Sequence, residues 1–281
     1  MKKAMIIGIL LTLGTSLAGC GASTAANNNS SANTGTSTGA SINKQDTITV
    51  ATSPTYPPFE YLKDNKLTGF DIAMIQDIAK IENLKVEFKT TPFDGIIPAL
   101  QSGQVDASVA GMTIKQTRLE AVNFSNAYYK SGLSILTKNG SNIKNLNDLK
   151  DKIVATEKGT SSVDLLQKNG IKNVKQYDYM NDAYNALENG GADAVVFDNP
   201  SNILFMASHK DVHIVGGLLT GEYYGIAVNK KETDLLSKID DGLEKIQANG
   251  DYAKLFDEYL SGDKNGMVKG TVSPKSVAIS G

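Results

Sequence analysis

A short pattern that occurs twice in the chain constrains its fold more than any other feature. Residues 99–109 and residues 186–196 both follow A-L-x-x-G-x-x-D-A-x-V. In each copy a helical pattern stops at a glycine, Gly103 or Gly190, and an apolar strand pattern follows. A repeated unit of helix, stop and strand predicts two lobes of similar topology.

Strand and helix patterns alternate along the rest of the chain, which favours parallel sheets flanked by helices. We expect strands at 48–51, 86–88, 107–109, 153–155, 174–177 and 194–197. We expect helices at 71–81, 94–102, 117–122, 162–168, 182–188, 235–246 and 252–260. The stretch from Asp46 to Gly266 has about 220 residues, enough for two modest domains. The prediction is an α/β fold of two lobes, each a mostly parallel sheet with helices.

The N-terminus has the pattern of a secretory signal. Lys2 and Lys3 precede a short apolar run at 6–11, and residues 17–20 read L-A-G-C. The run is shorter than the roughly 20 residues that cross a bilayer. Cys20, the only cysteine, stands as in the bacterial lipobox, which L-A-G-C resembles; the alternative is a buried structural cysteine. We expect a lipoprotein signal peptide at 1–19 and a lipid anchor at Cys20.

The segments that flank the globular part are low in complexity. Residues 20–45 are mostly Gly, Ala, Ser, Thr and Asn, which predicts a flexible tether with a reach of roughly 25–30 Å. A G-x-S-x-G pattern at 35–39 lies within it, with no strand before it, so we do not interpret it as a nucleophile. The Gly, Ser and Lys content of 263–281 predicts a flexible tail, in which 267–272 could add an edge strand.

The formal net charge is −2, or −4 without Lys2 and Lys3, which argues against a nucleic-acid partner.

Polar and aromatic residues gather at four predicted strand ends. Ligands of open parallel sheets bind beyond the carboxyl ends of the strands. The segments at these ends are 53–60, 110–113, 157–162 and 197–200. We therefore expect their side chains to meet in one site.

These segments could hold a zwitterion. Arg118 is the only arginine, and its planar fork grips a carboxylate at two points. Thr113 and the helix N-terminus at 160–161 could complete that carboxylate site. Asp198 could hold an ammonium group. The alternatives are a surface position for Arg118 and a helix cap before Pro200 for Asp198.

Several blocks resemble the extracellular solute-binding proteins for polar amino acids, the receptors of ABC importers, and among them the glutamine-binding proteins. The resemblance runs over about 47–260. Its blocks are Y-P-P-F-E at 56–60, G-F-D at 69–71, F-D-G-I-I-P-A-L at 93–100, A-G-M-T at 110–113 with Arg118, F-S at 124–125, Y-Y-K-S-G at 128–132 and A-D-A-V at 192–195. It implies a periplasmic-binding-protein fold with lobe 1 at 46–128 plus 226–262 and lobe 2 at 132–222. The hinge it implies contains Tyr129, Lys130, Ser131 and Tyr224.

The resemblance also implies roles for single residues. Arg118 and Thr113 would hold the α-carboxylate with help from the backbone at Ala110 and Ser161, and Asp198 would hold the α-ammonium. Tyr56 and Phe93 would clamp the ligand, unless these rings only pack in the core. The full ligand-binding set implied is Ser53, Tyr56, Phe93, Ala110, Gly111, Thr113, Arg118, Glu157, Thr160, Ser161 and Asp198.

Three positions depart from the glutamine-binding pattern. Ser53 replaces an aspartate, Glu157 a lysine and Phe197 a histidine, although Lys158 lies beside Glu157 and a shift of one residue is conceivable. A carboxylate at Glu157 would repel acidic ligands and suit an amide N–H or a cation, unless it is an exposed loop acid. The expected ligand is a polar L-amino acid, glutamine-like or basic.

The implied mechanism is capture by hinge closure, followed by delivery to a membrane permease and its ATPase. The receptor would be a monomer without cofactor or metal, lipid-anchored on the extracellular face of a Gram-positive bacterium. An enzyme on the same fold, such as a dehydratase with Glu157 or Glu60 as catalytic acid, is one alternative. The only histidines, His209 and His213, lie close together and outside the pocket segments. A surface adhesin is the other alternative.

Overall fold

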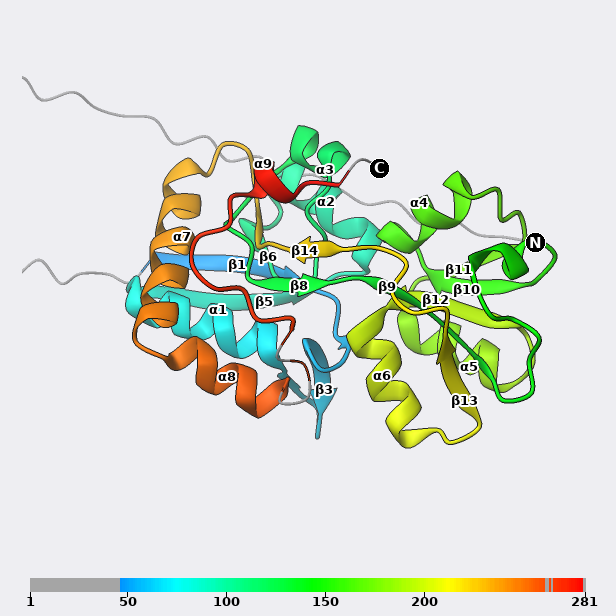
Figure 1. Cartoon of the computed structure of the whole chain (residues 1–281). Helices are drawn as coiled ribbons and strands as arrows, with labels where there is room; N and C mark the ends of the chain where they lie inside the picture. Colours follow the sequence, from blue (N-terminus) through cyan, green and yellow to red (C-terminus); the bar gives the residue numbers. More distant parts are fainter. Residues whose placement is uncertain (1–45, 261–262, 264, 280–281) are drawn as a thin grey trace, which may run out of the picture. The chain divides into compact units, whose positions relative to one another are not determined.

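The structure is a computed structural model that describes residues 46–260, 263 and 265–279. The signal peptide, Cys20, the tether and the pattern at 35–39 lie outside the described residues. Two five-stranded sheets, with a two-stranded sheet between them, organise the described part (Figure 1). A further small sheet has three strands. No helix in the described ranges is long and apolar enough to span a membrane.

The first five-stranded sheet has the strand order β5-β1-β6-β15-β7. Its strands are β1 (Asp46–Thr52), β5 (Leu84–Thr90), β6 (Ala107–Ser108), β7 (Asn123–Phe124) and β15 (Ala227–Val228). β1 pairs in parallel with β5 and β6, while β15 runs antiparallel to both of its neighbours. Its helices are α1 (Phe70–Ile81), α2 (Phe93–Gln101), α3 (Gln116–Ala121), α7 (Thr233–Ala248) and α8 (Asp251–Tyr259). α1 buries the apolar face that the sequence predicts, including Ile72, Ile75 and Ile78.

The second five-stranded sheet has the order β11-β10-β12-β9-β13. Its strands are β9 (Leu133–Lys138), β10 (Val154–Glu157), β11 (Val174–Tyr177), β12 (Ala194–Asp198) and β13 (Val212–Val215). β10 pairs in parallel with β11 and β12, and β9 runs antiparallel to its two neighbours. The helices that accompany it are η1 (Leu146–Leu149, 3-10), α4 (Ser161–Lys168), α5 (Met180–Glu188) and α6 (Asn199–Ser208).

The two sheets share one topology, and the repeated pattern occupies equivalent places in them. The first copy runs from α2 into β6 and the second from α5 into β12, each the central strand of its sheet. Gly103 and Gly190 follow the two helices with φ of 72° and 74°, a backbone conformation that glycine adopts readily. The prediction of two similar α/β lobes is confirmed, and four of the five strands in each sheet run in one direction.

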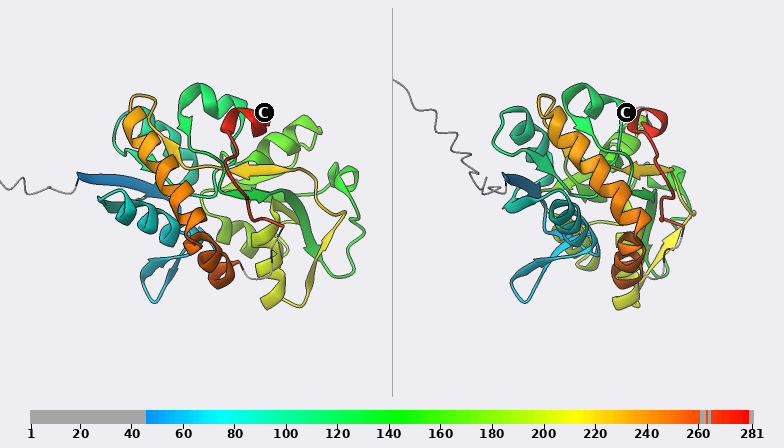
Figure 2. Two further views of the ribbon diagram at one scale, coloured as in Figure 1. Left: turned by 60° about the vertical axis from the view of Figure 1, so that its left-hand side comes forward. Right: turned by 90° about the vertical axis from the view of Figure 1, so that its left-hand side faces the viewer.

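Two antiparallel strands connect the sheets. β8 (Tyr129–Ser131) pairs with β14 (Glu222–Tyr224), so that Tyr129 faces Tyr224 in the register. The predicted hinge residues lie in these two strands. Figure 2 shows the pair from two further directions. The small sheet, which the sequence patterns do not reveal, consists of β2 (Thr55–Tyr56), β3 (Glu60–Lys63) and β4 (Lys66–Thr68).

The prediction of a flexible tail from residue 263 onward is wrong for the described residues 265–279. This segment runs beside β8 and ends beside α3, with a short helix α9 (Pro274–Val277) (Figure 1). Lys130 N donates to Gly266 O at 2.8 Å, and Ala127 N donates to Val272 O at 2.9 Å. Val268 is 5% exposed. The tail is held because its backbone satisfies donors of other segments, which composition does not reveal.

Candidate functional site

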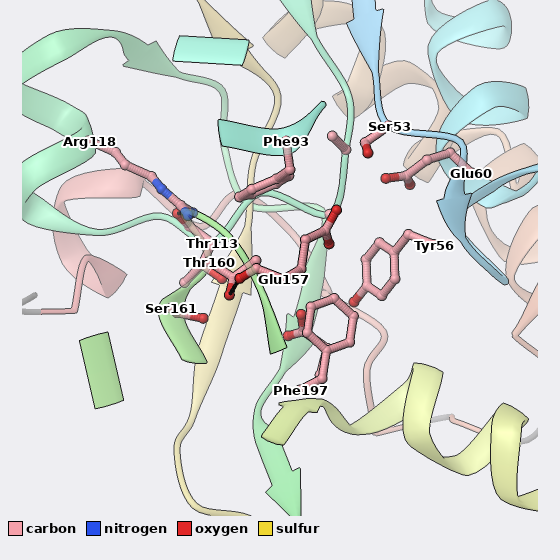
Figure 3. Close-up of a pocket in the computed structure, with 13 residues that line it drawn as sticks. Ser53, Tyr56, Glu60, Phe93, Thr113, Arg118, Glu157, Thr160, Ser161 and Phe197 are labelled. Carbon is pink, nitrogen blue, oxygen red and sulfur yellow. Dashed lines mark hydrogen bonds between the residues drawn. The ribbon is translucent and has the colours of Figure 1, made fainter. Parts of the chain in front are cut away.

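The segments at the four predicted strand ends meet in one pocket between the two sheets (Figure 3). Every residue of the predicted ligand-binding set lines it, and Glu60 and Phe197 join them. The enclosed free volume is about 10 Å³, roughly the space of one water molecule. An object as large as an amino acid therefore enters only if the walls move apart.

Arg118 lies deep in one end of the pocket, and its side chain is fixed. It is 3% exposed, so the alternative of a surface arginine is wrong. Nη1 donates to Thr113 O and Nη2 to Gly159 O, both at 2.8 Å, and the guanidinium lies 5.2 Å from the centre of the Phe93 ring. Burial lowers the pKa of Arg118 to about 10, so the group keeps its charge at neutral pH. These bonds occupy two of the five N–H donors of an arginine.

Glu222, which the sequence reasoning missed, lies behind this end of the pocket. Its Oε2 accepts hydrogen bonds from Thr113 Oγ1 at 2.6 Å and from Ser161 Oγ at 2.8 Å. Its Oε1 accepts from Thr220 Oγ1 at 3.0 Å. The hydroxyl hydrogens of Thr113 and Ser161 are therefore directed to Glu222, not to a ligand carboxylate. No local signal could have found this contact, because Glu222 is distant in sequence from both partners.

Thr160 marks the start of α4 at the same end. It occupies the N-cap position, but its hydroxyl donates to Glu157 O at 2.8 Å. Because no side chain among the described residues caps α4, the N–H groups of its first turn are available to an anion, which helix N-termini attract.

Asp198 is tied to the connecting strands. Its Oδ1 accepts a hydrogen bond from Tyr224 OH at 2.6 Å, and Tyr56 OH lies 2.6 Å from the same Tyr224 OH. Asp198 precedes α6 at its N-cap position, yet its carboxylate makes no capping hydrogen bond within the described structure. The competing interpretation as a helix cap therefore fails on geometry. Burial and then the charge of Glu222 raise the pKa of Asp198 to about 7.

The end of the pocket that lies away from Arg118 is acidic. Glu157, the last residue of β10, is 3% exposed, so the alternative of an exposed loop acid is wrong. Burial, followed by the charges of Asp198 and Asp94, raises its pKa to about 8. Lys158 does not line the pocket, and its Nζ lies 2.5 Å from Asp178 Oδ1 on the surface. Shifting the match to the glutamine-binding pattern by one residue therefore does not place the lysine charge in the site.

Aromatic rings form the walls between the two ends. Tyr56 packs edge to face on Phe197, with 5.3 Å between the ring centres, and stacks on Phe59 at 4.9 Å. Gly111 has a φ of 51°, and a Cβ there would approach the Tyr56 ring to 2.2 Å. The glycine therefore allows the loop after β6 to pass directly under the ring.

The histidines lie elsewhere. His209 stacks on Phe205, with ring centres 3.8 Å apart, and its Nε2 lies 3.1 Å from Glu188 Oε1. Neither histidine lines the pocket. In the described ranges no group of histidine, cysteine, aspartate and glutamate side chains is arranged to hold a metal ion.

Known proteins resemble this chain over nearly all of its described part. Residues 48–262 match the bacterial extracellular solute-binding proteins, family 3. A probable histidine-binding protein of Campylobacter jejuni subsp. jejuni serotype O:2 is 33% identical over 237 residues, which cover 81% of this chain and 91% of that protein. The ABC transporter glutamine-binding protein GlnH of Bacillus subtilis strain 168 is 34% identical over 203 residues, 70% of this chain and 74% of that protein. An ancestral arginine-binding protein, solved bound to arginine, has 42% identity and a TM-score of 0.72 over 76% of this chain and 97% of its own.

Proposed function

This chain belongs to the bacterial extracellular solute-binding proteins of family 3, and we propose that it captures a polar L-amino acid for an ABC importer. The similar proteins carry the names of histidine, glutamine and arginine binders, which supports an amino acid as the ligand. The same relatives support a role as the receptor that delivers its ligand to a membrane permease.

The observation that carries this proposal is that Arg118 and Asp198, of opposite charge, both line the same pocket. The N–H groups of Arg118, with those of the first turn of α4, suit the α-carboxylate. Asp198, held by Tyr224, suits the α-ammonium. The rings of Tyr56 and Phe93 offer walls for the rest of the ligand. Opposite charges at fixed places select a zwitterion over a simple acid or amine.

Capture proceeds by movement of the lobes about β8 and β14. The contacts that join the lobes beside the pocket include the hydrogen bond from Arg118 to Gly159 O and the ion pair of Lys115 with Asp164. The free volume of about 10 Å³ requires that the lobes separate before an amino acid enters. A ligand that contacts both lobes then favours the closed arrangement, because it binds that arrangement more tightly.

The pocket is that of a receptor and not of an enzyme. Glu157, Asp198 and Glu60 line the pocket with raised pKa values, a property that general acids share. The family and the similar proteins are receptors, which supports binding without turnover. We further propose a monomer that Cys20 anchors to the outer face of a Gram-positive membrane. Incubation of the protein with each amino acid that it binds, followed by product analysis, tests for turnover; any product contradicts the receptor proposal.

The experiment that tests the function is a thermal-shift screen with the twenty amino acids, cystine and ornithine. At a concentration about 100 times its Kd, a ligand stabilises the folded protein by about 2.7 kcal/mol. At least one polar amino acid is expected to raise the Tm. Arg118→Ala abolishes the shift, and Arg118→Lys loses most of it because lysine lacks the planar fork.

The matched control is Lys172→Ala, which removes an exposed positive charge and leaves the shift intact. An unchanged shift in folded Arg118→Ala, or no shift with any amino acid, would contradict the proposal.

A further inference from the structure

The acidic end of the pocket presents oxygen atoms that have no hydrogen-bond donor. Glu60 is fully buried, and no N–H or O–H group of the described residues donates to either of its carboxyl oxygens. The same holds for Glu157 Oε1 and Ser53 Oγ. Such atoms are costly to bury without a donor. A ligand that ends in several N–H donors would satisfy all of them.

A second carboxyl group lies behind Glu60. Asp71 Oδ2 accepts hydrogen bonds from Gly111 N at 2.9 Å and from Tyr128 OH at 2.7 Å. After burial, the charge of Asp71 is the largest influence that raises the pKa of Glu60. Glu60 is thus backed by a second acid and not by a compensating base.

The two pocket glutamates come from opposite lobes. Glu60 starts β3, which belongs to the lobe of the first sheet, and Glu157 ends β10 in the second sheet. Figure 3 shows their carboxyl groups pointing toward one another. They interact electrostatically, because Glu157 raises the pKa of Glu60, after the larger effects of burial and of Asp71. Closure of the lobes brings these two carboxyl groups together in a site from which water is excluded, and without a cation between them burial favours their protonated forms.

We propose that Glu60 and Glu157 form a subsite for the positive end of the ligand side chain, so that the captured solute is a basic L-amino acid. The proposal rests on the proposed function and names the ligand class of the same pocket. A guanidinium or ammonium group between the two carboxylates gains an attraction from each lobe. It also offsets the cost of ionising the two buried carboxyl groups, so the cation itself stabilises the closed form.

Ligand pairs that differ in charge and little in shape test the subsite. Arginine is compared with citrulline, and lysine with norleucine, by isothermal titration calorimetry of the mature protein. A neighbouring opposite charge changes the pKa of a carboxyl by about 1–3 units, which corresponds to about 10- to 1000-fold in affinity. At least one basic member is therefore expected to bind about 10- to 1000-fold more tightly than its neutral counterpart, and more tightly than glutamine.

Variants assign this preference to the two glutamates. Glu60→Gln and Glu157→Gln keep the size of the side chain and remove the charge, and each is expected to reduce the ratio of arginine to citrulline affinity by about tenfold or more. Citrulline affinity is expected to stay the same or rise. Glu87→Gln, which removes an exposed glutamate from the surface pair with Lys85, is the control and leaves the ratio unchanged.

The outcomes separate this inference from the function on which it rests. Equal binding of the charged and neutral members, or unchanged ratios in both folded glutamate variants, overturns the cation subsite while the amino-acid receptor stands. If no amino acid binds, the proposed function itself fails. Thermal unfolding of each variant shows whether it is folded, and either variant alone suffices for the test.

Discussion

At the scale of single residues, Tyr224 joins the connection between the lobes to the pocket. Its hydroxyl donates to Asp198 and lies 2.7 Å from Ser131 Oγ. It also bonds to Tyr56, a ring of the pocket wall. One hydroxyl therefore couples the proposed ammonium site, the β8 strand and the aromatic wall. A substitution at any of these three is expected to alter the hydrogen bonds of the other two.

The raised pKa of Asp198 predicts that ligand binding depends on pH. An ammonium group favours the ionised carboxylate, but the free protein holds a proton there below a pKa of about 7. Binding therefore releases a proton, and affinity falls as the pH is lowered through this value, by about tenfold for each pH unit. Calorimetric titrations of a neutral amino acid between pH 8 and pH 5 measure the slope.

Asp198→Asn provides the control for this dependence. The variant binds more weakly at pH 8, because the charge is lost, and its residual affinity changes little over the same interval. Affinity of the unmodified protein that stays constant or rises toward pH 5 would show that Asp198 does not hold the ammonium.

At the scale of elements, the C-terminal segment is part of the support of the connecting strands. Gly266 lies against the Tyr129 ring, and Tyr129 OH bonds to Asp263 at 2.5 Å. Val268 N donates to Tyr252 OH at 3.1 Å, while the end of the segment pairs with α3 through Gln116 N and Ile279 O. The segment spans from the connecting strands to the helix that carries the pocket arginine.

Removal of residues 265–281 is therefore expected to lower stability. The truncated chain loses these backbone hydrogen bonds and exposes the buried Tyr129. A loss of about 2–3 kcal/mol corresponds to a Tm lower by about 5–10 °C in a chain of this size. Calorimetric melting curves test this against a chain that ends at Ile279. Equal Tm values for the two chains would mean that the segment contributes nothing to the fold.

At the scale of the whole molecule, the charge distribution of the pocket governs closure. Arg118 faces Gly159 across the two lobes at one end, and Glu60 faces Glu157 at the other. The first end therefore attracts the opposite lobe without a ligand, while the burial of carboxyl oxygens that lack a donor at the second end opposes closure. The basic amino acid that we propose as the ligand would complement both ends, its zwitterion at the first and its side-chain cation at the second.

The proposed lipid anchor at Cys20 concerns where this molecule works. Substitution Cys20→Ala is expected to abolish metabolic palmitate labelling and to release the protein into the medium, because the lipid is its proposed attachment to the membrane. Ser23→Ala, three residues further along the same tether, is the control and keeps both the label and the membrane fraction. Unchanged labelling of the alanine variant would refute the anchor.

The sequence by itself determined the two-lobed α/β architecture and named the pocket-lining residues other than Glu60 and Phe197. Both depend on local signals: periodic burial within a helix or strand, glycine stops, and polar residues at strand ends, which each act over a few neighbouring positions. Arg118, Asp198 and Glu157 could be named for this reason. The resemblance of whole blocks then indicated the same residues.

Only the tertiary structure decided how these groups are partnered. Glu222 accepts hydrogen bonds from the hydroxyls of Thr113 and Ser161. Glu60 interacts electrostatically with Glu157 of the other lobe, and the segment 265–279 lies along β8. These contacts join segments far apart in the chain. The energies of these contacts depend on how completely each buried group is removed from water. Distant segments produce that burial, so the residues adjacent in sequence do not reveal it.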